Sequence, residues 1–564
     1  MKKIVLFIFV SIIYSSKTLG FEFKVFHTND LHSYFEGSGP DMSYTQKAGD
    51  GDIVKGHYAR LAYKVKEERK KSRVPTMLVD AGDFFAGTLF HALAPNKKVN
   101  VFPEAEFFKL LNYDATTLGN HEFDAGDSGL LVMLDKWQAA SVKTSIVSTN
   151  LIFHNEKSDL KKHVGRDKII KPYMVRELSH EGNKLRVGIL GLLGPDGALV
   201  SLGTRKDIGF TGFKDKESSK ELGALTKYLS SYVEKIKKEE KLDIVMALLH
   251  GGHPEDTEIL EEVPLIDLLI AGHTHTVYTK PIKVGNAILV QAGSFGRYLG
   301  KLELKWDGKK LHVLNKDTIL DIDDSIPSDI EMSEAINSYK KEIDKFLINT
   351  GFSYDSFVFT SKETLIRRSE SGNELGVLVT SGVREELNKT AFEPIDLYFT
   401  SLGLIRKNIT KDHSYQLSDI FKIMAIGFDE EQKPGPKVVS FYLSKSEVFD
   451  LINFMEVYGM ISHKFTPAFS NSVSYKNRWW GIPFLNKLGD LKLNGKSYDE
   501  WPEYIHVGTS QFVAAYLPKV QAMSYGMLEF IPKDKNGKVI DKPYIHPNKE
   551  YILLAKYLKS QYKN

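Results

Sequence analysis

The sequence has 564 residues, which is too long for one hydrophobic core and predicts two or three domains. A net charge of +3 over this length gives no basic surface for a nucleic acid polymer, so that class of partner is excluded. The chain has no cysteine, which rules out disulfide bonds and thiolate metal sites. Any metal ion must bind through Asp, His, Asn or Glu, a ligand set that suits zinc, manganese, magnesium or iron.

The first twenty residues have the pattern of a secretory signal peptide. A basic start at Met1–Lys3 precedes an apolar run from Ile4 to Tyr14, and small and polar residues follow up to Gly20. The apolar run is too short to span a bilayer, and no later segment approaches the ~20 apolar residues of a membrane helix. We expect export to the periplasm or the cell exterior, with an uncleaved N-terminal anchor as the alternative.

Strands and helices alternate through the first half of the chain, which predicts an α/β layered domain. Ligands in such folds gather beyond the strand ends. Further on, the pattern predicts a β meander over 287–319 with a hairpin at Asp307-Gly308. The expected strands are 23–28, 75–80, 144–150, 185–193, 244–249 and 265–271, and the expected helices are 58–71, 102–112, 130–140 and 219–238.

An acidic stretch that ends in Pro327 marks the predicted end of the first domain. A helical pattern follows at 333–346 and is expected to link this domain to a second one. We place the signal peptide at 1–20, the catalytic domain at 21–323, the linker helix within 324–350 and a second domain at 351–564.

Polar side chains that can bind metal ions follow several of the predicted strands. Any one of these histidines is more simply explained as a core residue with satisfied hydrogen bonds. Their repetition at strand ends favours a shared site instead, because unpaired buried polar groups are costly. Gly119, before one of them, predicts a sharp turn. The candidate ligands are Asp30, His32, Asp83, Asn120, His250, His273 and His275.

Seven ligands of this kind are about what two divalent ions need when they lie about 3.5–4 Å apart and share a carboxylate. We predict that Asp83 is the shared carboxylate. Two such ions would activate water near neutral pH and bind phosphate oxygens, which predicts hydrolysis of a phosphate ester by water attack. One ion is assigned to Asp30, His32, Asp83 and His275, and the other to Asp83, Asn120, His250 and His273.

His121 comes directly after a candidate ligand, so its side chain is expected to reach the phosphoryl or leaving-group oxygen rather than a metal. Asp124, three residues on, can hold the tautomer of this imidazole. We predict that the two form a catalytic pair that assists the leaving group. Asn120 is expected to touch the substrate as well, and Glu122 to support the turn.

The motifs D-x-H, G-D, G-N-H-E, H-G and G-H-x-H, in this order over about residues 21–305, resemble the calcineurin-like metallophosphoesterase superfamily. The runs at 27–32, 80–83, 119–124 and 291–294 resemble the 5′-nucleotidase family more narrowly. This resemblance implies a four-layer αββα catalytic domain, a dinuclear centre and a His–Asp dyad at His121 and Asp124. It also implies hydrolysis of nucleotide phosphates and a C-terminal α/β domain that binds the nucleoside.

The second domain keeps only part of the family pattern. The segment 401–406 resembles N-G-G-G-I-R, but leucines such as Leu402 replace glycines. Val377 replaces an asparagine, and Ile426 stands where the family has an aromatic that stacks on the base. The motif of the second stacking aromatic is absent near Pro518. An isoleucine cannot replace a π face, so the nucleotide pocket is expected to have changed.

Arg406, Arg367 and Arg368 are the predicted contacts for the substrate's phosphate, although Arg367 and Arg368 are equally well explained as part of a solvated face. We therefore expect a metal-dependent hydrolase of small phosphoesters, nucleotides by default. The departures leave open a non-nucleotide phosphoester, or a sulfur-linked substrate as in the related sulfur-oxidation hydrolases. A non-catalytic surface binding protein on this scaffold is the alternative from another class, and the intact ligand set argues against it.

Overall fold

The computed structural model describes residues 20–38, 55–367, 374–390, 393–425, 427–461, 466–476, 488–517, 520–521, 524, 526 and 528–562. The predicted signal peptide therefore lies outside the described residues except for its last position. Within these ranges no helix combines the length and the apolar character needed to cross a bilayer.

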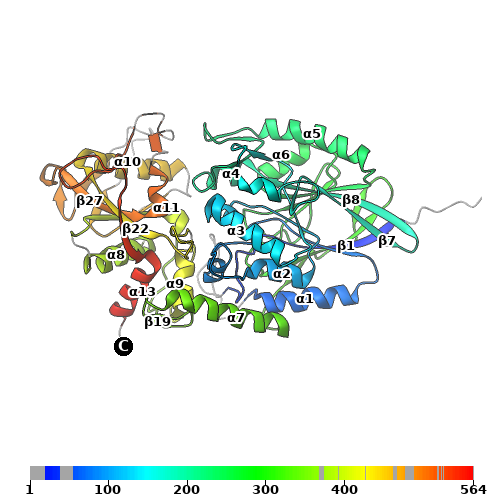
Figure 1. Ribbon diagram of the computed structural model, residues 1–564, viewed down its shortest axis with the longest axis horizontal. Coiled ribbons are helices and arrows are strands. Elements are labelled where there is room, and N and C mark those ends of the chain that lie inside the picture. Colours follow the sequence, from blue (N-terminus) through cyan, green and yellow to red (C-terminus); the bar gives the residue numbers. More distant parts are fainter. Residues whose placement is uncertain are drawn as a thin grey trace, which may run out of the picture.

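The first part of the chain forms two β-sheets that pack face to face (Figure 1). The first sheet has the order β17 (Leu311–Val313), β16 (Tyr298–Trp306), β1 (Phe21–Thr28), β2 (Thr76–Asp80), β3 (Ala115–Thr117), β4 (Ser145–Val147) and β6 (Ile170–Lys171), and β18 (Ile319–Asp321) also pairs with β16. The second sheet has the order β14 (Ile282–Val284), β15 (Ala287–Val290), β13 (Leu268–Ala271), β12 (Ile244–His250), β8 (Asn183–Leu193) and β7 (Met174–His180).

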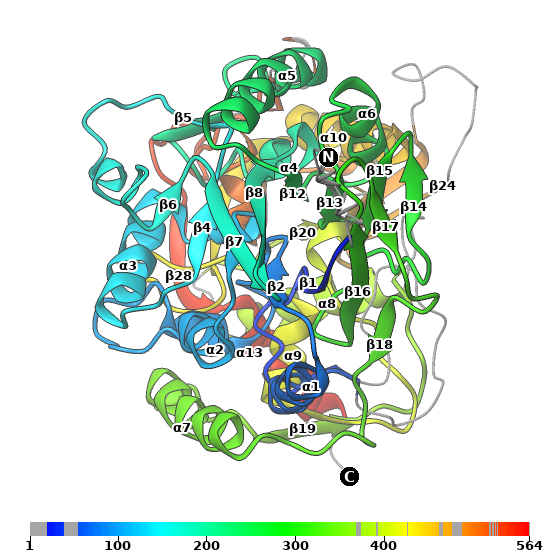
Figure 2. The same ribbon diagram turned by 90° about the vertical axis from the view of Figure 1, so that its right-hand side faces the viewer.

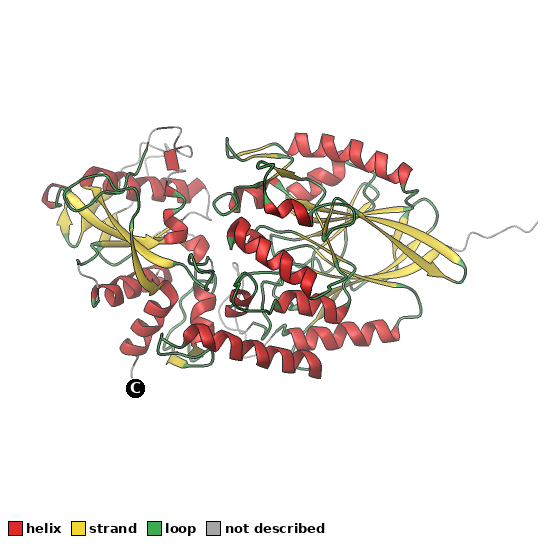
Figure 3. Ribbon diagram, viewed as in Figure 1, coloured by secondary structure: helices red, strands yellow, loops and turns green. Residues whose placement is uncertain are grey.

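Helices cover the outer face of each sheet, so the first part has four layers in the order α, β, β, α (Figures 2 and 3). The first sheet packs against α1 (Tyr58–Lys71), α2 (Pro103–Leu111) and α3 (Gly126–Ala139). The second sheet packs against α5 (Leu222–Glu239) and α6 (Glu255–Glu262). The predicted fold class is confirmed.

Side-chain alternation along the strands explains why the sheets are buried on both faces. Val25 and Met77 point into the core between the sheets, whereas their neighbours Phe26 and Leu78 pack against the helices. All residues of β12 are buried, as expected for a parallel strand covered on both sides. The expected strands and helices of this part are present with ends shifted by a few residues.

Gly191 of β8 lets the two sheets come close together near the end that carries the polar residues. A Cβ atom at Gly191 would lie 1.9 Å from the carbonyl oxygen of Val147 in the first sheet. The backbone N–H of Thr149 donates to the Gly191 carbonyl at 2.6 Å, which joins the two sheets directly. The absence of a side chain at this position is therefore required by the approach of the sheets.

The predicted β meander is wrong. β15 pairs with β13 in the second sheet, whereas β16 crosses over and pairs with β1 in the first. The hairpin between β16 and β17 is present, but the expected last strand is split into β17 and β18. The side chain of Asn315 interrupts it, because its amide donates to the carbonyls of Lys301 and Asp317 and accepts from the N–H of Glu303.

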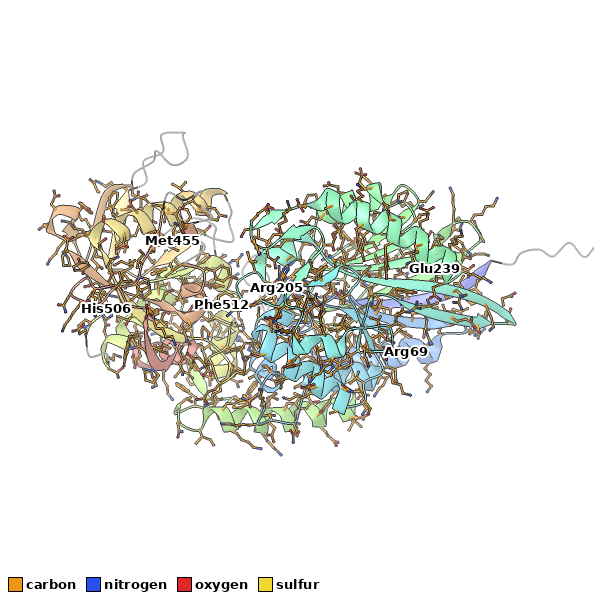
Figure 4. The ribbon with its side chains drawn as sticks, turned by 45° about the horizontal axis from the view of Figure 1, so that its top comes forward. Arg69, Arg205, Glu239, Met455, His506 and Phe512 are labelled. Atoms are coloured by element: carbon orange, nitrogen blue, oxygen red, sulfur yellow. The ribbon has the colours of Figure 1, made fainter. Side chains whose placement is uncertain are left out.

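The second part has its own sheet, with the order β23 (Pro467–Phe469), β20 (Leu397–Ser401), β27 (Tyr504–Ser510), β22 (Lys437–Ser444) and β28 (Tyr544–Lys549). In Figure 4, Phe512 lies on the side of the second part that faces Arg205 of the first. The helices of the second part are α8 (Glu374–Asn388), α9 (Leu417–Ile423), α10 (Lys445–Ile461), α11 (Gln511–Ala514) and α13 (Glu550–Gln561).

Shorter elements complete the two parts. In the first part these are α4 (Pro195–Val200), β5 (Leu151–Phe153), β9 (Ile208–Phe210), β10 (Phe213–Lys214) and β11 (Ser219–Lys220), with 3-10 helices at Leu89–Leu93, His121–Phe123 and Asp159–His163. In the second they are β19 (Phe357–Thr360), β21 (Ser414–Gln416), β24 (Val473–Lys476), β25 (Gly489–Leu493) and β26 (Lys496–Ser497), with 3-10 helices at Leu402–Leu404 and Tyr498–Glu500.

A helix follows the first part at the position predicted for the linker, α7 (Ile330–Leu347). Its buried side chains at Ile336, Tyr339 and Ile343 belong to the core that contains α1 and the helices of the first sheet. The helix packs onto the first part, against α1 and the 3-10 helix at Leu89–Leu93. The domain boundaries at 323 and 350 stay predictions.

Replacing Gly191 by alanine is expected to lower the free energy of unfolding by about 1–3 kcal/mol, because the added methyl group would meet the Val147 carbonyl between the sheets. Gly223 in α5 is the matched control, since an added Cβ there has open space around it. Gly223→Ala is expected to be neutral or stabilising by up to about 1 kcal/mol. Chemical denaturation measures both, and equal stability of the two variants would contradict the role of Gly191.

Candidate active site

Five strands deliver the predicted ligands to one edge of the facing sheets. β1, β2 and β3 run parallel to one another in the first sheet, as do β12 and β13 in the second, so their carboxyl ends lie at a common edge. The structure brings all of the predicted ligands together there. They are Asp30 and His32 after β1, Asp83 after β2, Asn120 after β3, His250 at the end of β12, and His273 and His275 after β13.

One cluster of donor atoms consists of Asp30, His32 and His275. The Nε2 atom of His275 lies 3.3 Å from Oδ1 of Asp30, and Nε2 of His32 lies 3.7 Å from the same oxygen. The two imidazole Nε2 atoms face each other at 3.1 Å. The three side chains are at most 6% exposed, and they therefore meet out of contact with bulk solvent.

A second cluster consists of Asp83, His250 and His273, with Asn120 beside it. Nε2 of His250 lies 3.0 Å from Oδ2 of Asp83 and 3.2 Å from Oδ1 of Asn120. Nδ1 of His273 lies 2.9 Å from the same Asn120 oxygen. Asp83 also lies 3.8 Å from Nε2 of His32. This carboxylate therefore stands between the two clusters, where a shared ligand was predicted.

The donor set fits divalent cations. The facing nitrogens of His32 and His275 repel each other unless a proton or a cation lies between them. The same holds where nitrogens of His250 and His273 approach the amide oxygen of Asn120. Burial lowers the pKa of His250, but the carboxylates of Asp83 and Asp30 and the Ala81 carbonyl together outweigh burial and raise this pKa to about 10. Burial opposes ionisation of Asp83, yet the surrounding histidines hold its pKa well below its ordinary value. The clusters thus attract positive charge and are able to hold metal ions.

Five of these residues adopt a left-handed backbone conformation that L-residues rarely take. Their φ angles are 50° at Asp30, 51° at His32, 52° at Asp83, 75° at His273 and 56° at His275. Such a conformation costs about 1–3 kcal/mol per residue and persists only where neighbours enforce it. Backbone hydrogen bonds do so here, since the N–H of Asp30 and that of His32 donate to carbonyls in the turn after β2. Strain of this kind is concentrated at functional sites.

Glu122 supports the turns that carry Asp83 and Asn120. Its buried carboxylate accepts from the backbone N–H groups of Gly119 at 2.5 Å, Phe85 at 3.0 Å and Asp83 at 3.1 Å. The predicted supporting role of Glu122 agrees with these contacts. Gly119 serves a purpose other than the predicted sharp turn, because a Cβ atom there would lie 2.2 Å from Oδ1 of Asp83.

His121 and Asp124 form the predicted pair. Nδ1 of His121 lies 2.7 Å from Oδ2 of Asp124, and the backbone N–H of His121 donates to Oδ1 of Asp83 at 2.8 Å. Burial lowers the pKa of the imidazole, but the carboxylates of Asp124 and Asp83 outweigh it and raise the pKa to about 9. The pair therefore provides a proton donor next to the donor clusters.

A pocket beside the clusters is shared by the two parts of the chain. Arg406 reaches it from the loop after β20, where its backbone N–H donates to the Ile423 carbonyl at 2.8 Å. Burial lowers the pKa of the guanidinium to about 10, and the nearby Asp30 opposes that shift. Arg406 thus lines the pocket, and its contact with phosphate stays a prediction. The pocket is lined by His32, Tyr34, Gly87, His121, Phe295, Arg406 and Ala425.

Two further contacts join the two parts of the chain. The ring of Phe428 stacks on that of Phe85, with centroids 5.8 Å apart and an interplanar angle of 7°. The hydroxyl of Tyr516 donates to the carbonyl of Val200 at 3.1 Å. The second part is thus packed directly against the first near residues 85 and 200.

Arg367 and Leu402 of the second part support the loop and the core around Arg406. Arg367 donates from Nη1 to the carbonyls of Leu402 at 3.2 Å and Ile405 at 3.3 Å, so it braces the loop that carries Arg406. The side chain of Leu402 is buried in the core, and there it occupies space that glycine would leave open. Three residues of the predictions lie outside the described ranges: Arg368, Ile426 and Pro518.

Residues that were not predicted also reach the site. Tyr34 and Phe295 line the pocket with ring centroids 4.1 Å apart. Asp196 lies 2.9 Å from Nε2 of His273. Asp196 follows the end of β8, so the strand-end rule that found the ligands would also have indicated this residue.

The comparisons with known proteins agree with this geometry. Residues 23–277 match the calcineurin-like phosphoesterase family. The chain contains a calcineurin-like phosphoesterase domain. The trifunctional nucleotide phosphoesterase YfkN of Bacillus subtilis is 26% identical over 430 residues, which are 72% of this chain and 26% of that protein. The 5′-nucleotidase of Bos taurus is 29% identical over 343 residues, which are 58% of this chain and 54% of that protein.

Solved structures share the fold of this chain over almost its whole length. A 5′-nucleotidase precursor from Thermus thermophilus has a TM-score of 0.69 at 19% identity and covers 96% of this chain and 97% of its own. The sulfate thiohydrolase SoxB of the same species has a TM-score of 0.63 at 15% identity, over 96% and 94%. At these identities the likeness concerns the fold alone. The chain spans about a quarter of the length of YfkN and about half that of the animal 5′-nucleotidases.

Glu122→Ala is expected to lower the free energy of unfolding by about 3 kcal/mol or more, because three buried N–H groups lose their acceptor. Glu122→Gln keeps an acceptor oxygen and is expected to lose less. Glu331→Ala, at an exposed glutamate of α7, is the control and is expected to stay within about 0.5 kcal/mol. Urea denaturation ranks the three, and a Glu122→Ala protein as stable as the control would refute the supporting role.

Proposed function

We propose that this chain is a dinuclear metal-dependent phosphoester hydrolase of the 5′-nucleotidase type. The observation that carries the proposal is the pair of donor clusters on either side of Asp83, next to the His121–Asp124 pair. When bound, two divalent ions would activate water and bind phosphate oxygens. Asp30, His32, Asp83 and His275 would hold one ion, and Asp83, Asn120, His250 and His273 the other.

The protein's own residues would orient the phosphoester and supply a proton. Asp124 accepts the Nδ1 proton of His121, so Nε2 of this imidazole is left to donate toward the leaving-group oxygen. Arg406 would bind the phosphoryl oxygens through its guanidinium. Tyr34 and Phe295 would exclude water from that side of the pocket.

Nucleotides are the default substrates of this proposal, because the named relatives include 5′-nucleotidases and a nucleotide phosphoesterase. One observation favours a different substrate. Among the described residues, the second part contributes Arg406 and Ala425 to the pocket, and neither offers an aromatic face. Stacking on such a face contributes roughly 1–3 kcal/mol per base. A non-nucleotide phosphoester, or a sulfur-linked ester, is therefore the second candidate.

We also propose that the protein is exported. The basic, apolar and small-residue segments of the first twenty positions support export. An exported hydrolase of this kind would act on small phosphoesters in the periplasm or outside the cell. N-terminal sequencing of the protein isolated from its source would find a start near Phe21, whereas an intact Met1 would contradict cleavage.

The proposal is tested by hydrolysis assays on protein stripped of metal with a chelator and reloaded with Mn²⁺ or Zn²⁺. The panel is 5′-AMP, UDP-glucose, p-nitrophenyl phosphate and bis-p-nitrophenyl phosphate. We expect turnover to disappear on chelation and to return on reloading. Asp83→Asn is expected to abolish it, and His121→Ala to lower kcat by about 10²- to 10⁴-fold. His312→Ala, at a half-exposed surface histidine, is the control and should keep full activity.

The substrate panel separates the candidates. Fast 5′-AMP turnover would mean that the second part still binds nucleosides. Turnover of the aromatic esters alone would favour the non-nucleotide candidate. No turnover by protein shown to bind two metal ions would refute hydrolysis of these phosphoesters and favour the binding-protein alternative.

Arg406→Ala is expected to lower kcat/KM about 10- to 100-fold, because a charge-assisted hydrogen bond to phosphate contributes about 1.5–3 kcal/mol. If the guanidinium binds the phosphoryl group, the loss is equal for 5′-AMP and p-nitrophenyl phosphate. A loss confined to one leaving group would assign Arg406 to the leaving group instead. Arg166→Ala, at an exposed arginine paired with Glu240, is the matched control.

A further inference from the structure

The imidazole of His273 is held at both nitrogens. Its Nδ1 atom faces Oδ1 of Asn120 at 2.9 Å, on the side of the donor cluster. Its Nε2 atom lies 2.9 Å from Oδ2 of Asp196, on the opposite side of the ring. A histidine that offers one nitrogen to a cation must carry its proton on the other, so the acceptor at Nε2 decides which nitrogen is available.

The other histidine of the same cluster is held differently. Nε2 of His250 faces the donor cluster, and its Nδ1 lies 2.9 Å from the backbone carbonyl of Ala81. A neutral carbonyl fixes the tautomer of His250, whereas a carboxylate does this for His273. A carboxylate partner also makes the imidazole a stronger electron donor.

Asp196 is itself fixed by charged neighbours. Its Oδ1 atom accepts from Nζ of Lys220 at 2.7 Å, and its backbone N–H donates to the carboxylate of Glu255 at 3.0 Å. Nζ of Lys220 lies 3.5 Å from the same Glu255 carboxylate. Glu255 is buried against Gly194, where a Cβ atom would lie 2.5 Å from it. Three elements, α4, β11 and α6, thus meet behind His273.

We propose that Asp196 is a positioning residue that holds the proton of His273 on Nε2 and turns Nδ1 toward the cluster of Asp83 and His250, with Lys220 fixing the carboxylate. The inference rests on the proposed metal role of His273. An ion pair with a merely structural role would need only to join α4 to the turn after β13. A positioning role requires in addition that the carboxylate tune the affinity of the cluster for metal.

The test measures metal affinity directly, without turnover. Metal-free protein is titrated with Zn²⁺ in competition with a chromophoric chelator, and the visible spectrum of the Co²⁺-loaded protein is recorded. Asp196→Asn keeps the size of the side chain and removes its charge. We expect one of the two binding events to weaken about 10- to 100-fold, the usual effect of losing such an outer partner, and the Co²⁺ spectrum to shift.

Asp215→Asn is the matched control. Asp215 lies between α4 and α5, as Lys220 does, and pairs with the buried Arg205 at 3.1 Å and with His154 at 2.8 Å. This variant is expected to lower the melting temperature while metal affinity and spectrum stay as in the wild type. Should Asp196→Asn fold poorly, Lys220→Met removes the partner of the carboxylate from a half-exposed position and is expected to weaken the same binding event.

His273→Ala distinguishes failure of the inference from failure of the proposed function. If His273→Ala weakens binding and Asp196→Asn does not, the positioning role is refuted while His273 stays a ligand. If His273→Ala binds Zn²⁺ as tightly as the wild type, the ligand assignment fails and the inference fails with it. Equal weakening in Asp196→Asn and Asp215→Asn would reduce Asp196 to a structural ion pair.

Discussion

Asp83 is the residue on which the arrangement of the site depends. Its carboxylate meets His250 on one side and His32 on the other, and it also accepts the backbone N–H of His121. A carboxylate buried this deeply needs compensating charge and donors, and both are present. The missing side chain at Gly119 leaves room for it, and Glu122 holds its backbone. Both donor clusters and the proton donor are thus positioned relative to one buried anion.

The site could be predicted from the sequence largely because its residues obey a local rule. Each predicted metal ligand lies at the end of an apolar strand or within four residues of it, so a residue such as Asp83 or His250 is found by reading strand ends. The sheet to which a strand belongs depends on distant pairing, which is why β15 and β16 were wrongly joined in a meander. The contact of Asp196 with His273 is equally non-local, although its place after β8 carried the same signal.

The loop that carries Arg406 keeps its place in the second part despite a bulky substitution next to it. Leu402 stands where the family has a glycine, and its side chain has been taken up by the core. Arg406 nevertheless reaches the pocket, because Arg367 braces the preceding loop through its carbonyls. The position of Arg406, the proposed phosphate contact, therefore does not require a glycine at position 402.

The short helix α4 contacts both the metal-ligand candidate His273 and the second part of the chain. Its first turn carries Asp196, which contacts His273, and its last residue is Val200, whose carbonyl accepts the hydroxyl of Tyr516 from the second part. Residues in contact with a common element do not contribute independently. A substitution within α4 is therefore expected to change both the orientation of His273 and the contact between the two parts. Natural variation at this helix should be accompanied by compensating changes both near the turn after β13 and around Tyr516.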